Sequence, residues 1–229
     1  MDPDNNLDSN RSVAPNNDAN PNKLTNKKVD IDMNEQLFQA AERKEAKTIR
    51  GLIEEGVDIN TQDSDGRTAM MIATYNNDVE IVKVLIAAGA DVNIQDHIQN
   101  NPFLYAGAEG YLDILKLTIK AGADPSITNR YGGTALIPAS EHGYVDVIKE
   151  LLTNTDIDVN HVNDPGWTAL LEAIILSNGD EKQQQTVQLL IDHGADVNIP
   201  DSHNVTPLQH ARGKGFKKIE QVLLKAGAK

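Results

Sequence analysis

The chain has no cysteine among its 229 residues. This absence excludes disulfides, thiolate metal sites and cysteine nucleophiles, and it is typical of a reducing compartment. No stretch approaches the ~20 apolar residues of a membrane-spanning helix, and the N-terminus lacks the apolar region of a signal peptide. We therefore expect a cytoplasmic protein, although delivery elsewhere stays open.

Basic residues are also scarce. The chain carries 21 Lys and Arg against 34 Asp and Glu, a net charge of −13. Phosphate-rich nucleic acid and anionic membrane surfaces attract basic proteins, so we expect neither as a partner. The exception is residues 201–229, with six basic and two acidic side chains. This end is either a solvated cap or a docking patch.

Residues 1–30 have almost no apolar side chains. They hold eight asparagines and three prolines, too little apolar surface to offset the entropy lost on ordering. We expect a disordered tail over 1–30, with Asn34 capping the first helix of the folded part. Whether the tail is a plain flexible end, a tether or an export leader stays open.

One phrase recurs along the rest of the chain. It reads IEEGVDINTQD at 53–63, IAAGADVNIQD at 86–96, IKAGADPSITN at 119–129 and IDHGADVNIPD at 191–201, with a worn copy, NTDIDVNHVN, at 154–163. The first two intervals are 33 residues each. A fixed period of this length indicates a stack of units that bury their apolar faces against one another.

Residues 63–95 show what one unit contains. Asp65-Gly66 is a turn signal, and Thr68 is placed to cap a short helix. After a break at Asn77-Asp78, a second apolar helix runs to about Ala88, closed by Gly89 as a residue of positive φ. The unit is a turn, a helix, a turn, a longer helix and a loop.

This pattern resembles the ankyrin repeat. The helix-opening tetrapeptide appears as TAMM, NPFL, TALI, TALL and TPLQ, and QNNPFLYA and GWTALLEAI are similar to segments of small bacterial proteins made almost wholly of ankyrin repeats. The resemblance implies an all-α solenoid of about six helix-turn-helix units joined by hairpin-like loops. The expected domain is 31–229, with units at about 31–62, 63–95, 96–128, 129–162, 163–200 and 201–229.

Several residues depart from the family pattern. The family's histidine after T-P-L is replaced by Met71, Leu104, Ile137, Leu171 and Gln209, so packing is expected to replace its hydrogen bond. Pro138, about a turn further in than the first helical position, is expected to lose a helical hydrogen bond or to loosen that turn. Unit 129–162 carries one extra residue, assigned to 152–156. Unit 163–200 carries five within 177–185, where Asp180 is expected to cap a longer second helix.

The family resemblance also implies a binding surface. Ankyrin arrays usually bind proteins through the hairpin tips and the outward positions of the first helices, which line a concave face. The tip positions carried over are Arg67, His97, Asn100, Arg130, Tyr131, Asp164, Trp167 and His203. The helix positions are Tyr75, Glu109, Glu141, His142, Ile175 and Leu176. Tryptophan, tyrosine and arginine are enriched at binding hot spots, but Trp167 and Tyr131 can instead pack locally.

We therefore expect a monomeric, non-enzymatic protein-binding scaffold with no cofactor and no metal. Its unknown partner is expected to present a basic or mixed apolar–basic surface to this acidic array. Two alternatives stay open. One is an enzyme or sugar-binding protein that uses Glu109, Glu141 and His142; an open, wet groove offers nothing obvious to raise the pKa of one carboxylate there. The other is a structural repeat protein without a single partner.

Overall fold

A computed structural model describes residues 21–229, with side chains from Asp32 onward. Within that range the chain forms twelve α-helices and no strand. The helices are α1 Pro21–Glu42, α2 Ala46–Glu54, α3 Ala69–Tyr75, α4 Val79–Ala87, α5 Pro102–Glu109, α6 Leu112–Lys120, α7 Leu136–His142, α8 Val145–Asn154, α9 Ala169–Ile175, α10 Glu181–Asp192, α11 Pro207–Gly213 and α12 Lys217–Lys225. The all-α expectation is confirmed.

The first helix begins earlier than expected. Helix α1 starts at Pro21 and runs unbroken past Asn34, so Asn34 is not its cap. Proline is well suited to the first helical position, and no glycine or further proline stops the helix before Glu42. Residues 21–30 are therefore helical, contrary to the expected disorder. The part of that expectation on residues 1–20 lies outside the described residues.

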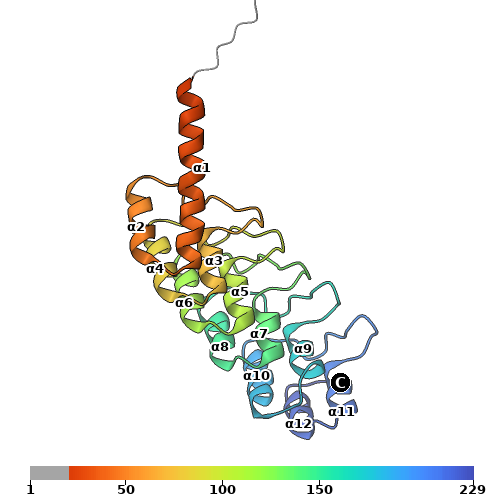
Figure 1. Cartoon of the computed structure of the whole chain (residues 1–229). Helices are drawn as coiled ribbons and strands as arrows, with labels where there is room; N and C mark the ends of the chain where they lie inside the picture. Colours follow the sequence, from red (N-terminus) through yellow and green to blue (C-terminus); the bar gives the residue numbers. More distant parts are fainter. Residues whose placement is uncertain (1–20) are drawn as a thin grey trace, which may run out of the picture.

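The twelve helices form six antiparallel pairs that stack in chain order (Figure 1). The first helices of the pairs pack on one another in sequence: α1, α3, α5, α7, α9 and α11. The second helices form a parallel row: α2, α4, α6, α8, α10 and α12. The loops between pairs project together from one side of the stack (Figure 1). Each pair contacts its neighbours, as expected of a solenoid.

The predicted signals fix the ends of these helices. Thr68 Oγ1 accepts from the backbone N–H of Met71, three residues on, which stabilises the start of α3. Gly89 follows α4 with φ +87°, a conformation that costs glycine little. In the enlarged fifth pair, Asp180 Oδ1 accepts from Gln183 N at 3.1 Å. The predicted cap and longer α10 are confirmed.

Helix α7 is the irregular one. It starts at Leu136, so Pro138 falls in its first turn, where a backbone N–H has no partner within the helix. The Thr134 hydroxyl makes no cap and has no hydrogen-bond partner among the described residues. The loosening expected from Pro138 thus shows as a late helix start and a lost cap.

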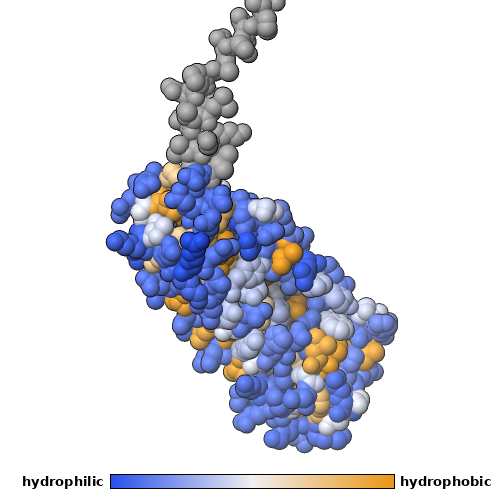
Figure 2. All heavy atoms as spheres, in the orientation of Figure 1, coloured by the Kyte–Doolittle hydropathy of each residue, from blue (hydrophilic) through white to orange (hydrophobic). Residues whose placement is uncertain are grey.

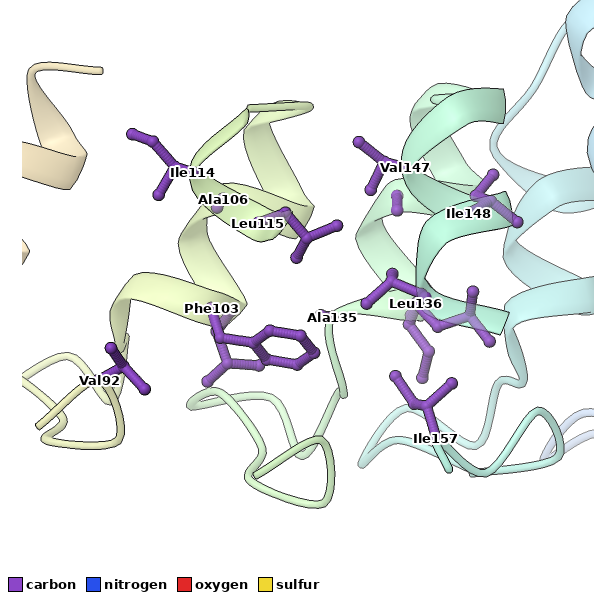
Figure 3. Close-up of a cluster of buried hydrophobic side chains, with 14 of the residues drawn as sticks. Val92, Phe103, Ala106, Ile114, Leu115, Ala135, Leu136, Val147, Ile148 and Ile157 are labelled. Atoms are coloured by element: carbon purple, nitrogen blue, oxygen red, sulfur yellow. The ribbon is translucent and has the colours of Figure 1, made fainter. Parts of the chain in front are cut away.

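The core lies between neighbouring pairs. Figure 3 shows Phe103 of α5, Leu115 of α6 and Val147 of α8 between the third and fourth pairs, and all three are at most 2% exposed. First helices approach closely enough that a Cβ added at Gly107 would lie 2.8 Å from the Ala135 Cβ. Five further apolar residues of the stacked helices are at 0% exposure: Ala73, Ala173, Leu85, Leu151 and Leu190.

The residues that replace the family's histidine behave in two ways. Met71, Leu104, Ile137 and Leu171 are buried, so packing does replace the hydrogen bond there. Gln209 is exposed, and its side chain accepts from Thr206 N at 2.8 Å while Thr206 Oγ1 accepts from Gln209 N. This reciprocal pair is a capping box, which fastens the start of α11.

Candidate interaction surface

The first-helix face is defined here as the hairpin tips together with the outward sides of α3, α5, α7, α9 and α11. In Figure 2 hydrophobic residues on the visible face form separate spots among hydrophilic ones. The five exposed large hydrophobics in the described range are Ile98, Tyr131, Val162, Leu176 and Leu224. Three of these five, Ile98, Tyr131 and Leu176, belong to the first-helix face.

Neighbouring first helices meet in a repeated register. Tyr75 follows the helix-opening Thr68 by seven residues, and Tyr105 follows its own opening residue, Asn101, by four. Their rings make an edge-to-face contact with centroids 4.5 Å apart. Position seven of one repeat therefore meets position four of the next. We call such a contact a seven–four pair.

The aromatic seven–four pair is satisfied within the chain. The Tyr75 hydroxyl donates to Asp96 Oδ2 and accepts from Asn100 Nδ2 at 3.3 Å. Burial and this bond to Asp96 raise the pKa of Tyr75 to about 12. A third ring, Tyr111, lies 6.1 Å from Tyr105. The cluster gives this end of the face rigid aromatic surface.

The second seven–four pair consists of two carboxylates. Glu141 follows Thr134 by seven residues and Glu172 follows Thr168 by four. Glu172 is only 7% exposed. Burial and the charge of Glu141 raise the pKa of Glu172 to about 7, against a hydrogen bond that Asn163 Nδ2 donates to Glu172 Oε1 at 2.9 Å. Among the described residues no Lys, Arg or His forms a salt bridge with either carboxylate.

The hairpins are held by an aspartate or asparagine at one repeated position. Asp63, Asp96, Asn129, Asn163 and Asp201 each accept from the backbone N–H four residues on, through Oδ1. Such side chain-to-backbone bonds fix a turn locally. The other side-chain atom of Asp96, Asn163 and Asp201 reaches Tyr75, Glu172 and His210 respectively. The hairpins thus set the geometry of the first-helix face.

Two predicted tip residues already make contacts within the chain. Arg67 forms salt bridges with Asp63 at 2.7 Å and, more loosely, with Glu42 and Asp65. The Arg130 guanidinium lies 4.9 Å from the ring centroid of Tyr131. A partner that binds either arginine must compete with these contacts.

Two other tips lean on the preceding hairpin. The His97 N–H donates to Asp65 O at 3.0 Å, and its ring covers Gly66 so closely that an added Cβ would lie 2.6 Å from His97 Cδ2. Likewise Asp164 N donates to Tyr131 O at 2.9 Å, and its carboxylate covers Gly132. The glycines make room for this stacking.

The remaining predicted residues are spread over the same face. Exposed members are Glu109, His142, Leu176 and His203, and half-buried members are Asn100, Trp167 and Ile175. Trp167 donates its backbone N–H to Asn163 Oδ1 at 2.8 Å, which fixes its place beside the Glu172 contact. Glu109 acts on Tyr105, whose pKa is raised first by burial and then by that charge.

Sequence reasoning missed the position-four residues Tyr105, Glu172 and His210. The signal lay in the variable position just after the motif's histidine site, which the family pattern leaves unspecified. The carboxylate on which the charge of Glu141 acts is Glu172, and Glu172 is where the pKa rises. Within the described range no group of three or more His, Asp or Glu is placed to hold a metal ion. Nor is any described helix long and apolar enough to cross a membrane.

Six stacked helix pairs with hairpin-like tips define a helical repeat protein. A family model for ankyrin repeats in three copies matches residues 11–96 and 103–201. The chain therefore belongs to the ankyrin repeat family. The first of these matches begins inside the segment that composition assigned to the tail.

Solved structures and a curated relative agree. An ankyrin repeat domain from Acinetobacter baumannii AYE is 51% identical with a TM-score of 0.83, and the match covers 84% of this chain and 98% of that one. EF0377, an ankyrin repeat protein, is 39% identical with a TM-score of 0.81 over the same shares. The putative ankyrin repeat protein YahD of Escherichia coli (strain K12) is 54% identical over 80 residues, which cover 35% of this chain and 40% of that protein. The resemblance to bacterial ankyrin repeat proteins is confirmed.

Proposed function

We propose that this protein is a protein-binding module whose first-helix face holds a partner with a basic or mixed apolar–basic surface. The fold generally mediates protein–protein interaction, and ankyrin repeat proteins are typically non-enzymatic. The observation that carries the proposal is that the charge of Glu141 acts on the buried Glu172, while neither carboxylate forms a salt bridge to a described cation. A lysine or arginine from a partner that paired with the half-buried Glu141 would offset the charge that acts on Glu172.

Aromatic and apolar groups flank that pair. Trp167 and Tyr131 lie on the hairpins beside it, while Ile175 and Leu176 end α9. Tyrosine and tryptophan supply large contact area with little loss of conformational freedom, so they are natural anchors. The proposal thus assigns affinity to the rings and selectivity to the carboxylates.

The test begins with crosslinking and mass spectrometry to identify the partner. Trp167→Ala and Glu141→Gln should each weaken binding about thirtyfold if they are hot spots, with the fold intact. Lys149→Ala and Gln188→Ala, exposed positions on α8 and α10, are the matched controls and should bind as wild type. Loss of binding in the controls with normal binding in both test variants would reject this surface.

Salt gives an independent check on the role of charge. Glu109 and Asp164 are exposed, so they should act mainly on the association rate, and raising the salt should slow association. An association rate indifferent to salt would assign binding to the apolar residues alone.

The raised pKa of Glu172 is the one observation that favours an enzyme. A carboxyl group that keeps its proton near pH 7 suits a general acid. Its 7% exposure and its bond to Asn163 leave little access for a substrate, so we rank binding first. Turnover of any substrate that is abolished by Glu172→Gln would reverse the order.

The compartment and the oligomeric state complete the proposal. Lack of cysteine suits a reducing environment, and we assign the protein to the cytoplasm as a monomer. Cell fractionation checks the first assignment, and sedimentation equilibrium checks the second.

A further inference from the structure

A row of asparagines ties each loop to the next one. Asn93 Oδ1 accepts from Asp124 N at 2.8 Å, and Asn93 Nδ2 donates to Gly122 O at 3.2 Å. The equivalent asparagine makes the same bond elsewhere in the stack: Asn60 accepts from Asp91 N, Asn160 from Asp196 N and Asn198 from Lys229 N. We call these four residues the asparagine ladder.

The ladder has one gap, between the third and fourth repeats. Ser126 stands where the other loops have asparagine, and its hydroxyl donates to Asp124 Oδ1 at 2.6 Å instead of reaching the next loop. The next loop is itself different. Helix α8 runs to Asn154 without the usual closing glycine, and Thr155 Oγ1 donates to Leu151 O at 2.6 Å.

A cleft of about 360 Å³ lies at this gap. Its lining comes from both loops and from the start of the fourth repeat: Asp124, Pro125, Ser126, Thr134, Asp156, Ile157, Asp158 and His161. The volume is near the lower end of the range for small-molecule sites. A small polar ligand therefore fits better than a large apolar one.

Thr134 is the unusual member of the lining. It is 2% exposed, and its hydroxyl has no hydrogen-bond partner within the described part of the chain. The equivalent Thr68, Thr168 and Thr206 each cap their helix. A buried hydroxyl without a partner carries a free-energy cost, which a ligand would offset if it reached this hydroxyl from the cleft.

The charges in the lining are of one sign. Asp124, Asp156 and Asp158 contribute three carboxylates, and no Lys or Arg lines the cleft. Bonds from the Ser126 hydroxyl and N–H lower the pKa of Asp124 below its usual value, so this carboxylate stays charged. His161 Nε2 lies within hydrogen-bonding distance of Gly132 O, at 2.6 Å. The described acidic residues are not grouped to hold a metal ion.

We propose that this cleft is a binding site for an alkylammonium ion, held by the carboxylates of Asp124, Asp156 and Asp158 and by the Thr134 hydroxyl. A free polyamine and a lysine side chain offer the same chemistry. The site is separate from the first-helix face and does not depend on the function proposed for that face.

The test is calorimetric titration of the full chain with spermidine at low ionic strength. Asp158→Asn should weaken binding at least about tenfold, the loss of one charge-assisted hydrogen bond. Asp196→Asn is the matched control. It removes the same charge from the equivalent loop, where Asp196 Oδ1 accepts from Asn198 N at 2.9 Å as Asp158 Oδ1 does from Asn160 N. The control should bind spermidine as wild type does.

Thr134→Val separates the hydroxyl from the charges. It should weaken spermidine binding severalfold and leave the melting temperature unchanged or higher, since no bond of the folded protein is lost. Thr168→Val, which removes a cap, should instead lower the melting temperature and keep spermidine affinity. A lower melting temperature for Thr134→Val with unchanged binding would overturn the role of its hydroxyl.

The remaining arms identify the ligand. Binding of Nα-acetyl-lysine amide, which keeps its side-chain ammonium, without binding of spermidine would support the site with a partner's lysine as its source. Equal weakening by Asp158→Asn and Asp196→Asn would show nonspecific attraction to an acidic protein and overturn the proposal. Displacement of spermidine by equimolar Mg²⁺ would overturn it in favour of a metal site. Failure of both amines to bind wild type would also overturn it.

Discussion

The two seven–four pairs occupy equivalent positions and differ in how well they are satisfied. At Tyr75 and Tyr105 the rings pack edge to face, and the Tyr75 hydroxyl has both a donor and an acceptor as neighbours. At Glu141 and Glu172 the same positions hold like charges, with one hydrogen bond from Asn163 to offset them. The repeat sets the geometry, and the residue type decides whether the contact stabilises.

This difference separates structural from functional positions. A satisfied pair contributes to stability whether or not a partner is present. A pair of facing carboxylates costs free energy until a cation arrives. Such a cost at one position of an otherwise well-packed array is typical of a binding site.

The largest predicted effect tests the register that makes the two pairs equivalent. Leu151 of α8 is fully buried, so Leu151→Ala should cost about 2–5 kcal/mol of unfolding free energy. Its neighbour Leu152 is half-buried, and Leu152→Ala should cost clearly less. Urea denaturation measures both. Equal costs would show that the fourth repeat is out of phase.

Breaking the aromatic pair should come next. Tyr75→Phe leaves Asp96, which is 7% exposed, without the donor to its Oδ2, so we expect a loss of about 1–3 kcal/mol. Tyr131→Phe is the control because Tyr131 is 55% exposed, and it should stay within about 0.5 kcal/mol of wild type. A neutral Tyr75→Phe would remove the contrast between the pairs.

Removing the Glu172 carboxylate should stabilise the protein, whereas removing the Tyr75 hydroxyl should destabilise it. The gain at Glu172 should depend on pH. The pKa of Glu172 is about 7 in the folded protein, against an ordinary value of 4.5. Folding therefore favours its protonated form, so its contribution to stability is present below about pH 4.5 and is lost as the pH rises through 7. Glu172→Gln should match wild type near pH 5 and exceed it at pH 8.

Melting curves at several pH values check this prediction. A stability difference that does not grow between pH 5 and pH 8 would mean that Glu172 is charged in the folded state at both. The tyrosine pair supplies a second window. Since the pKa of Tyr75 is raised to about 12, wild type should lose stability between pH 10 and 12, and Tyr75→Phe should lose less.

The smallest effect is expected at the exposed edge of the face. Glu109 lies in solvent beside Tyr105, so Glu109→Gln should change the unfolding free energy by no more than about 0.5 kcal/mol. A larger gain would show that Glu109, rather than Glu172, is the costly carboxylate. Chemical denaturation beside wild type is sufficient.

The ends of most helices could be predicted from the sequence because the signals that set them are local. Thr68, Gly89 and Asp180 each act through hydrogen bonds or dihedral angles within a few residues, and all three were placed correctly. The start of α1 at Pro21 was missed. A composition rich in asparagine was read as disorder, although helix-compatible residues without a glycine or inner proline run from there to Glu42.

The site was harder to predict because it depends on contacts between repeats. The outward positions Tyr75 and Glu141 follow from spacing alone. Their partners Tyr105 and Glu172 come from the next repeat and lie at a position the family motif leaves free. Only the packing of one repeat on the next shows that Glu172 is buried and that the charge of Glu141 acts on it. Whether the predicted residues bind a partner stays a prediction.

The most direct test of the central claim is an NMR titration of the Glu172 side-chain carboxyl carbon. The claim is that the repeat places the buried Glu172 where the charge of the half-buried Glu141 acts on it, with no described cation in a salt bridge to either. We predict a midpoint near pH 7 in wild type, a lower midpoint in Glu141→Gln, and a fall toward 4.5 when a basic partner binds. A midpoint near 4.5 in the free wild-type protein would contradict the claim.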